Sequence, residues 1–216
     1  MSRTRAVIFD FNGTLSHDEP VLLSIYQALF AEHGRPISAD EYFSTFAGNT
    51  EEAIISGWLG VDGAELDALV AERISRYQAT ADGSTITAEM RDAVRFAAAH
   101  GPVAIVSGAF RAEIEPVLAA AGLTELFGAV VTADDVVNGK PAPDGYLHAL
   151  DLIGGVAPAD VVAFEDTEAG VASAKAAGLR CVAVLGTLPA ARLAEADEIV
   201  ERIDVLLLER LLESDS

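Results

Sequence analysis

Residues 6–15 read AVIFDFNGTL, a short apolar run followed by a polar loop that carries Asp10 and a glycine. Four consecutive apolar residues bounded by turn residues are typical of a buried β-strand. Asp10 is then expected at the carboxyl end of that strand, where open α/β sheets place their ligand sites. The stretch therefore predicts an α/β sheet that starts near residue 6 and has a polar site at the end of its first strand.

Further short apolar runs alternate with helical stretches from about residue 85 onward. The runs are 103–106, 129–131, 161–164 and 181–185. Strands that alternate with helices predict a parallel sheet with helices on both of its faces. Cys181, the single cysteine, lies in the last run. We expect it to be a buried strand residue, because one cysteine can form no internal disulfide.

Residues 16–84 contain no comparable strand run, and their apolar residues recur at helical spacing. One helix is expected through Val21 to Leu29, a second after residues 50–52, and a third through Leu66 to Ile74. This pattern predicts a helical module, 16–84, inserted into a core made of 1–15 and 85–216. The polar stretches 16–20 and 81–85 are its predicted hinges.

The charge balance excludes several classes of partner. The 216 residues include 14 basic and 34 acidic residues, a net charge of -20, which repels nucleic acid and anionic membrane surfaces. The apolar run after Arg5 is far too short for a signal peptide, and no stretch approaches the roughly 18 apolar residues of a membrane helix. We expect a cytoplasmic protein with no nucleic-acid or membrane partner. The sequence contains no signal for an oligomeric state.

Four polar elements are predicted to meet at one edge of the sheet. They are Asp10 and Thr14 after the first strand, Ser107-Gly108 after the second, Lys140 in the segment GKPAP, and Glu165-Asp166 after the run 161–164. Each element alone is ordinary loop chemistry. Together they supply a carboxylate nucleophile, a cation and donors to phosphate oxygens, which phosphoryl transfer requires.

In this order the four elements resemble the motifs of the haloacid dehalogenase superfamily of phosphatases and phosphomutases. The first motif is matched by residues 10–14, the second by Ser107, the third by Lys140 and the fourth by residues 165–170, EDTEAG. The resemblance covers nearly the whole chain and is nearest to the subgroup of β-phosphoglucomutase and small sugar-phosphate phosphatases. It implies a Rossmann-like catalytic core, a helical cap and Mg²⁺ as the cofactor.

The resemblance assigns the nucleophile and the metal ligands. Asp10 would attack the phosphorus and form an aspartyl-phosphate. Mg²⁺ prefers hard oxygen ligands, which Asp10 and Asp166 would supply, with Glu165 direct or through water and the backbone carbonyl of Asn12 completing the protein's share. A site holding three carboxylates and one lysine would otherwise repel itself.

The phosphate itself would be held by a second group of residues. Lys140 would neutralise the charge that Asp10 and the phosphate share. Ser107, Gly108 and Thr14 would provide hydroxyl and backbone N–H donors to the phosphate oxygens.

Asn12 departs from the family pattern, because it stands where the phosphatases resembled have a carboxylate that acts as general acid and base. An amide cannot exchange a proton in this way. Loss of such a group typically lowers a rate by about 10²- to 10⁴-fold, so binding should survive better than turnover. Three explanations stay open: a natural variant with slow or specialised turnover, for example on an acyl phosphate; a phosphate-binding protein that no longer catalyses; or a substitution made in the laboratory.

The cap is expected to select the substrate. No lysine or arginine occurs from Pro36 through Glu72, so no cationic clamp for a second phosphate is predicted there. This favours a monophosphate over a mutase substrate, with Asn49 and Thr50 as candidate contacts, although both residues also suit a simple helix cap. His17 replaces the acidic residue usual before the cap and is a further candidate, either as a proton donor or as an exposed hinge residue.

The expected function is therefore Mg²⁺-dependent hydrolysis of a small phosphorylated metabolite, and the alternative is a catalytically impaired protein that binds a phospho-ligand. A true dehalogenase also uses a nucleophile like Asp10 but needs no metal, which leaves Glu165-Asp166 unexplained. A phosphonate-cleaving enzyme is expected to use a lysine of the cap. Both lysines of the chain, Lys140 and Lys175, lie outside it.

Overall fold

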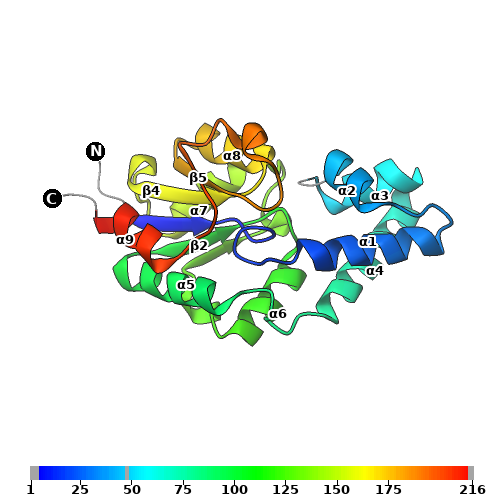
Figure 1. Cartoon of the computed structure of the whole chain (residues 1–216), viewed down its shortest axis with the longest axis horizontal. Coiled ribbons are helices and arrows are strands. Elements are labelled where there is room, and N and C mark those ends of the chain that lie inside the picture. The colour runs from blue at the N-terminus through cyan, green and yellow to red at the C-terminus, as the bar shows by residue number, and fades with distance from the viewer. Residues whose placement is uncertain (1–4, 47–48, 214–216) are drawn as a thin grey trace.

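Residues 5–46 and 49–213 are described by the computed structural model of the chain (Figure 1). Their strands form one sheet in the order β3-β2-β1-β4-β5-β6, and every neighbouring pair is parallel. The strands are β1 (Ala6–Phe9), β2 (Val103–Val106), β3 (Ala129–Val131), β4 (Val161–Glu165), β5 (Arg180–Val184) and β6 (Glu198–Val200). The predicted parallel α/β class is confirmed, and β6 is an edge strand that the sequence pattern did not indicate.

Helices cover both faces of this sheet, as the alternation of strands and helices predicts. On one face α5 (Ala88–His100), α6 (Arg111–Ala121) and α9 (Val205–Glu213) pack against Val7 and Phe9. On the other face α7 (Asp144–Leu152) and α8 (Glu168–Ala176) pack against Ala6 and Ile8. Successive residues of β1 thus alternate between two apolar cores. Short 3₁₀ turns complete the core at Thr124–Leu126, Ala133–Asp135, Pro158–Asp160 and Ala190–Leu193.

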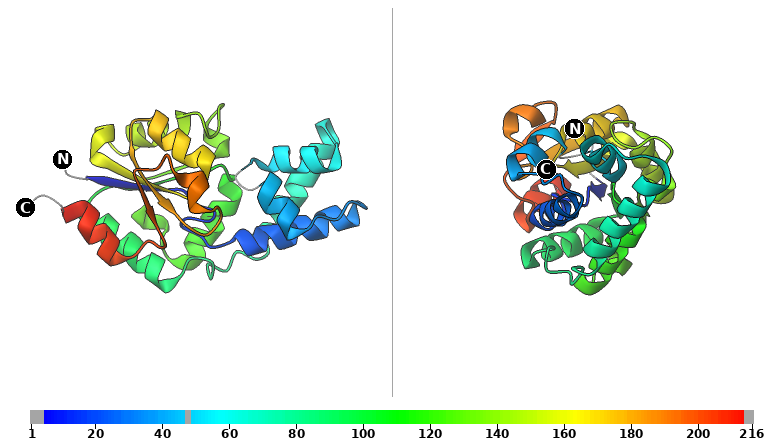
Figure 2. Two further views of the ribbon diagram at one scale, coloured as in Figure 1. Left: turned by 45° about the horizontal axis from the view of Figure 1, so that its top comes forward. Right: turned by 90° about the vertical axis from the view of Figure 1, so that its right-hand side faces the viewer.

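The inserted module consists of helices in its described part. They are α1 (Glu19–Glu32), α2 (Ala39–Thr45), α3 (Glu51–Leu59) and α4 (Gly63–Gln78). They share a separate apolar cluster around Tyr26, Phe30 and Ile55. In Figure 2 this cap lies beyond one end of the sheet and is joined to the core by the segments before α1 and after α4. The helical cap is confirmed, while its boundaries at 15/16 and 84/85 stay a prediction.

Local capping explains the one cap helix that apolar spacing missed. Helix α2 is only seven residues long, too short to show a helical period. It begins with a capping box in which the Ser38 hydroxyl accepts from the backbone N–H of Glu41, and the Glu41 carboxylate accepts from the backbone N–H of Ser38. Capping residues, rather than periodicity, were the available signal.

One single-residue expectation is tested by the fold. Cys181 is buried in β5, as predicted. Within the described ranges, no helix combines the length and the apolar character needed to cross a bilayer.

Candidate active site

The strand order brings three of the predicted motifs to one edge of the sheet. Strand β1 lies between β2 and β4, so the residues that follow these three strands are neighbours. Asp10 directly follows β1, Ser107 follows β2, and Glu165 ends β4 with Asp166 next in the chain. The chain passes from β1 to β2 on one side and reaches β4 on the other, which makes this the switch point where such sheets bind ligands.

Three buried carboxylates converge at this point. Asp10, Glu165 and Asp166 each offer an oxygen atom, and these atoms all lie within 4.8 Å of one another. Burial raises the pKa of Glu165 to about 7, with Lys140 opposing the rise and Asp10 adding to it. The pKa of Asp166 is also raised, by burial and then by the charges of Asp10 and Glu165. Hard oxygen donors that repel one another in this way fit a divalent cation.

Glycine allows the carboxylates to come this close to the backbone. Gly13 has φ of 74°, and a Cβ atom there would lie 2.0 Å from Oδ2 of Asp166. A Cβ atom on Gly170 would lie 1.8 Å from Oε2 of Glu165, an oxygen for which the described residues provide no hydrogen-bond partner. Larger residues at either position would push the carboxylates out of the cluster.

Lys140 lies against two of the carboxylates, as its predicted role requires. Its Nζ atom is 2.6 Å from Oδ1 of Asp10 and 2.6 Å from Oε1 of Glu165, and it donates to the carbonyl oxygen of Val106 at 3.0 Å. Burial alone would lower the pKa of Lys140, but the carboxylates of Asp10 and Glu165 raise it above its ordinary value. Lys140 therefore stays charged and fixes Asp10.

Two hydroxyl groups also hold the carboxylates, and neither was predicted from the sequence. The Tyr146 hydroxyl donates to Oε1 of Glu165 at 2.6 Å, and the Thr187 hydroxyl donates to Oδ2 of Asp166. Tyr146 follows the Lys140 segment on α7 and looks like an ordinary core residue. Thr187 follows β5 and belongs to no motif, so only the fold reveals either contact.

The predicted phosphate ligands fall into two groups. Ser107 and Gly108 line a cavity that opens above Asp10, and the Ser107 hydroxyl accepts from the backbone N–H of Ala109 at 3.1 Å. Thr14 is completely buried and is not among the residues that line this cavity. Its role with phosphate stays a prediction.

Asn12 forms a specific contact with the hinge of the cap. Its Nδ2 atom donates to Oδ2 of Asp18 at 2.8 Å, and the Tyr77 hydroxyl donates to the same oxygen. Asp18 is fully buried. An aspartate at position 12 would set two carboxylates against each other here, so the amide of Asn12 suits this position.

The cap contributes residues to the same cavity as Asp10. The cavity has a volume of about 310 Å³, and its cap wall includes Asn49, Thr50, Glu51, Glu52 and Arg73. Thr50 also caps α3, since its hydroxyl accepts from the backbone N–H of Ala53 at 3.3 Å. Thr50 is therefore both the cap of α3 and part of the cavity wall, and its contact with substrate stays a prediction.

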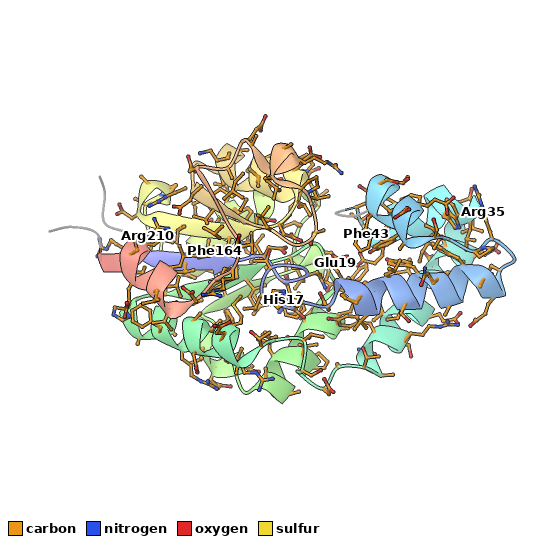
Figure 3. The ribbon with its side chains drawn as sticks, viewed as in Figure 1. His17, Glu19, Arg35, Phe43, Phe164 and Arg210 are labelled. Atoms are coloured by element: carbon orange, nitrogen blue, oxygen red, sulfur yellow. The ribbon has the colours of Figure 1, made fainter. Side chains whose placement is uncertain are left out.

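His17 is not brought to the cavity. Its side chain is exposed and absent from the cavity lining, while its backbone N–H donates to the carbonyl of Thr85 in the second hinge. Figure 3 shows it on the segment between β1 and α1. The position is that of an exposed hinge residue, and a contact with substrate stays a prediction.

The lack of a lysine or arginine from Pro36 through Glu72 does not keep every cation of the cap away from the cavity. Arg73 lies one residue beyond the segment that lacks lysine and arginine, and it lines the cavity although it is only 1% exposed. Its guanidinium forms ion pairs with Glu113 of α6 and, at 3.5 Å, with Glu51 of α3. Two carboxylates already neutralise this arginine, so it differs from a free phosphate clamp.

Comparisons with known proteins point to the same family that the four motifs resemble. The model of the haloacid dehalogenase-like hydrolase family matches residues 4–178. The validoxylamine A 7'-phosphate phosphatase of Streptomyces hygroscopicus subsp. limoneus is 32% identical over 91% of this chain and 93% of its own length. The fructose-1-phosphate phosphatase YqaB of Escherichia coli is 30% identical over 84% of this chain and 97% of its own.

A solved structure shows the same fold at lower identity. A CbbY variant from Rhodobacter sphaeroides, in complex with xylulose-(1,5)-bisphosphate, superposes with a TM-score of 0.82 at 24% identity, covering 93% of this chain and 95% of its own. The fold, the order of the motifs and the match over most of the chain agree, and the chain belongs to the haloacid dehalogenase-like hydrolases.

Proposed function

We propose that the chain is a Mg²⁺-dependent phosphatase that hydrolyses a phosphate monoester of a small sugar-like metabolite through an aspartyl-phosphate at Asp10. The observation that carries this proposal is the contact of Lys140 with Asp10 beside two further buried carboxylates, in a cavity that the core and the cap line together. The family match and the phosphatase relatives support the reaction class, a phosphoric monoester hydrolase.

The residues present divide the work of phosphoryl transfer. Lys140 holds one oxygen of Asp10, which leaves the other to attack the phosphorus. Ser107 and Gly108 lie beside that point and would orient the phosphate oxygens. Bound to Asp10, Asp166, Glu165 and the carbonyl of Asn12, Mg²⁺ would supply the positive charge that lets an anionic nucleophile approach an anionic phosphate.

The cavity wall favours a monophosphate whose remainder is neutral and polar. Asn49 and Thr50 offer an amide and a hydroxyl, while Glu52 adds negative charge. Arg73 is already paired with two carboxylates and so offers little to a second phosphate. The relatives named for validoxylamine A 7'-phosphate and fructose-1-phosphate support a sugar-like substrate. The acidic composition and single cysteine agree with action in the cytoplasm, which we propose on that basis.

Asn12 favours a second candidate, a protein that binds a phospho-ligand but no longer turns it over. The amide cannot perform the proton transfers of the missing carboxylate. Its hydrogen bond to the buried Asp18 weighs against a substitution made in the laboratory, because the amide and the carboxylate are complementary. A natural variant is the better explanation.

A panel of small phosphate esters separates the two candidates. With Mg²⁺, the purified protein is expected to release inorganic phosphate from at least one sugar phosphate or acyl phosphate, measured colorimetrically. If the protein releases no phosphate from any member of the panel, and Asn12→Asp then does so strongly, the binding function is correct and the enzymatic one is wrong.

Mg²⁺ is expected to raise the temperature of thermal unfolding at neutral pH, because it neutralises the three buried carboxylates. A ligand at 100 times its Kd stabilises by about 2.7 kcal/mol, a shift of several degrees for a domain of this size. Differential scanning fluorimetry with MgCl₂, against NaCl at equal ionic strength, measures the shift. Asp166→Asn should lose most of it. An equal shift in that variant would place the metal elsewhere.

A further inference from the structure

A carboxyl group that belongs to none of the four motifs faces the cavity beside Asn12. Glu19, the first residue of α1, lines the cavity together with Asp10 and Asn12. Figure 3 places it where α1 leaves the core and enters the cap. Its Oε2 atom is buried and has no hydrogen-bond partner within the described part of the chain. Buried polar atoms are nearly always partnered, and the cavity-lining Tyr26 and Arg73 share this exception. Of these three side chains, Glu19 is the one whose carboxyl group can both give and take a proton near neutral pH.

The neighbouring residues fix this carboxyl group without using it. Asn12 and Tyr77 both donate to Oδ2 of Asp18, which ties the hinge to the loop after β1 and to helix α4. Asp18 is itself fully buried and does not line the cavity. Glu19 follows it directly, and the hinge contacts therefore hold Glu19 at the cavity wall. Asp18 therefore holds the hinge in place, and the Glu19 side chain is the one that can reach a ligand in the cavity.

We propose that Glu19 is the general acid and base of the reaction and performs the proton transfers that Asn12 cannot. This inference rests on the proposed phosphatase function. In the first step an Asp10 oxygen bonds to phosphorus, the ester P–O bond breaks, and the Glu19 carboxylic acid gives its proton to the departing alcohol oxygen. In the second step the Glu19 carboxylate takes a proton from water, the water oxygen bonds to phosphorus, and the bond between phosphorus and Asp10 breaks. Inorganic phosphate leaves, and both side chains return to their starting states.

The surroundings suit a carboxyl group that must both give and take a proton near neutral pH. Burial raises the pKa of Glu19 to about 7, and the charges of Asp18 and Asp10 add to the rise. The ideal pKa of such a group lies close to the operating pH. The charged and titratable groups that interact with Glu19 are Asp18 in the hinge, Asp10 after β1, Asp166 after β4, Tyr42 of α2 and Arg73 of α4, of which Arg73 lowers its pKa.

Glu19→Gln tests the role, because the amide keeps the shape and removes the proton transfer. With an alkyl phosphate that the wild type hydrolyses, kcat is expected to fall by about 10²- to 10⁴-fold. With p-nitrophenyl phosphate, whose phenolate leaves without a proton, the variant should release one equivalent of nitrophenolate rapidly and then stall as the aspartyl-phosphate. A kcat of the variant on the alkyl phosphate within about threefold of the wild type would overturn the proposal. So would a first step that is slowed equally for the alkyl phosphate and for p-nitrophenyl phosphate.

Glu65→Gln is the matched control. Glu65 is an exposed residue in the first turn of α4, so the variant removes the same charge from the start of another cap helix, away from the cavity. Its kinetics are expected to equal those of the wild type. Circular dichroism shows whether Glu19→Gln is folded, and if it is not, Glu19→Asp replaces it, with a reduced kcat and the same dependence on the leaving group expected.

Two further results separate the proposal from its neighbours. The wild-type profile of kcat/KM against pH should contain an ionisation near neutrality that Glu19→Gln lacks. A loss that depends on the leaving group in Asp18→Asn, but not in Glu19→Gln, would give the role to Asp18. A wild type that releases phosphate from nothing refutes the phosphatase function and this inference together. An active wild type matched by Glu19→Gln refutes only the role of Glu19.

Discussion

Asp10→Asn is expected to lower phosphate release by about 10⁶-fold, the size of effect seen when an enzyme loses its nucleophile. An amide oxygen is too weak a nucleophile to attack a phosphate monoester. The fold should survive, because Lys140 keeps its contact with Glu165 at 2.6 Å. Steady-state assays with the best substrate of the panel measure the loss.

The same change is expected to abolish activity in an Asn12→Asp background. A carboxylate at position 12 adds a second group that can transfer a proton, but the nucleophile is still missing. Phosphate release that persists in the double variant would mean that another residue attacks the phosphorus. Circular dichroism spectra and unfolding temperatures of both variants serve as the control for folding.

Lys140→Met is expected to lower the free energy of unfolding by about 3–5 kcal/mol, the cost of removing one partner from a buried ion pair. Lys140 lies within 2.6 Å of oxygens of both Asp10 and Glu165, and the Glu165 side chain is 0% exposed. Without the lysine, three carboxylates remain together with no cation. Activity should be lost as well, and urea unfolding in metal-free buffer measures the change in stability.

The other lysine of the chain provides the matched control. Lys175 contacts Asp197 at 2.6 Å, but both side chains are more than one third exposed. Lys175→Met should therefore cost only about 0–1 kcal/mol. Equal losses for the two lysines would contradict the view that Lys140 compensates buried charge.

The destabilisation by Lys140→Met is also expected to depend on pH. The pKa of Glu165 is raised to about 7 with Lys140 in place, and loss of the lysine raises it further. At about pH 5 Glu165 is then protonated in the variant, and the uncompensated charge is reduced. As the pH rises through 7, the unfolded chain releases the proton of Glu165 freely, whereas the folded variant must either keep the proton or bury an uncompensated charge. The difference in the free energy of unfolding between variant and wild type therefore grows.

Much of the fold could be predicted from the sequence because its strands are buried on both sides. The continuous apolar runs of β1, β2, β3, β4 and β5 each appear as strands within one residue of their predicted bounds. The exception is β6, three half-buried residues at the edge of the sheet that produce no apolar run. Helix α2 was missed for a related reason, since it is too short for a period and begins with a capping box.

The site residues that lie at the ends of strands could be predicted from the sequence. Asp10, Ser107, Glu165 and Asp166 each follow or end a strand, so topology alone brings them together. Contacts that depend on the cap docking against the core were not predictable.

The paired state of Arg73, which joins α4 to Glu113 of α6, is one such contact. The position of Glu19 is another. In the sequence Glu19 is a charged residue that precedes a proline in a predicted hinge. Only the fold shows that its side chain lines the cavity.

If Asp10 is the nucleophile, the phosphoryl group must be bound to its carboxylate before it is released. Mass spectrometry of the wild-type protein, quenched in acid within milliseconds of mixing with Mg²⁺ and its substrate, tests this most directly. We expect a phosphoryl group on the peptide that contains Asp10, and none in Asp10→Asn. A phosphoryl group on another residue, or phosphate release with no phosphorylated peptide at any time, would show that Asp10 is not the nucleophile.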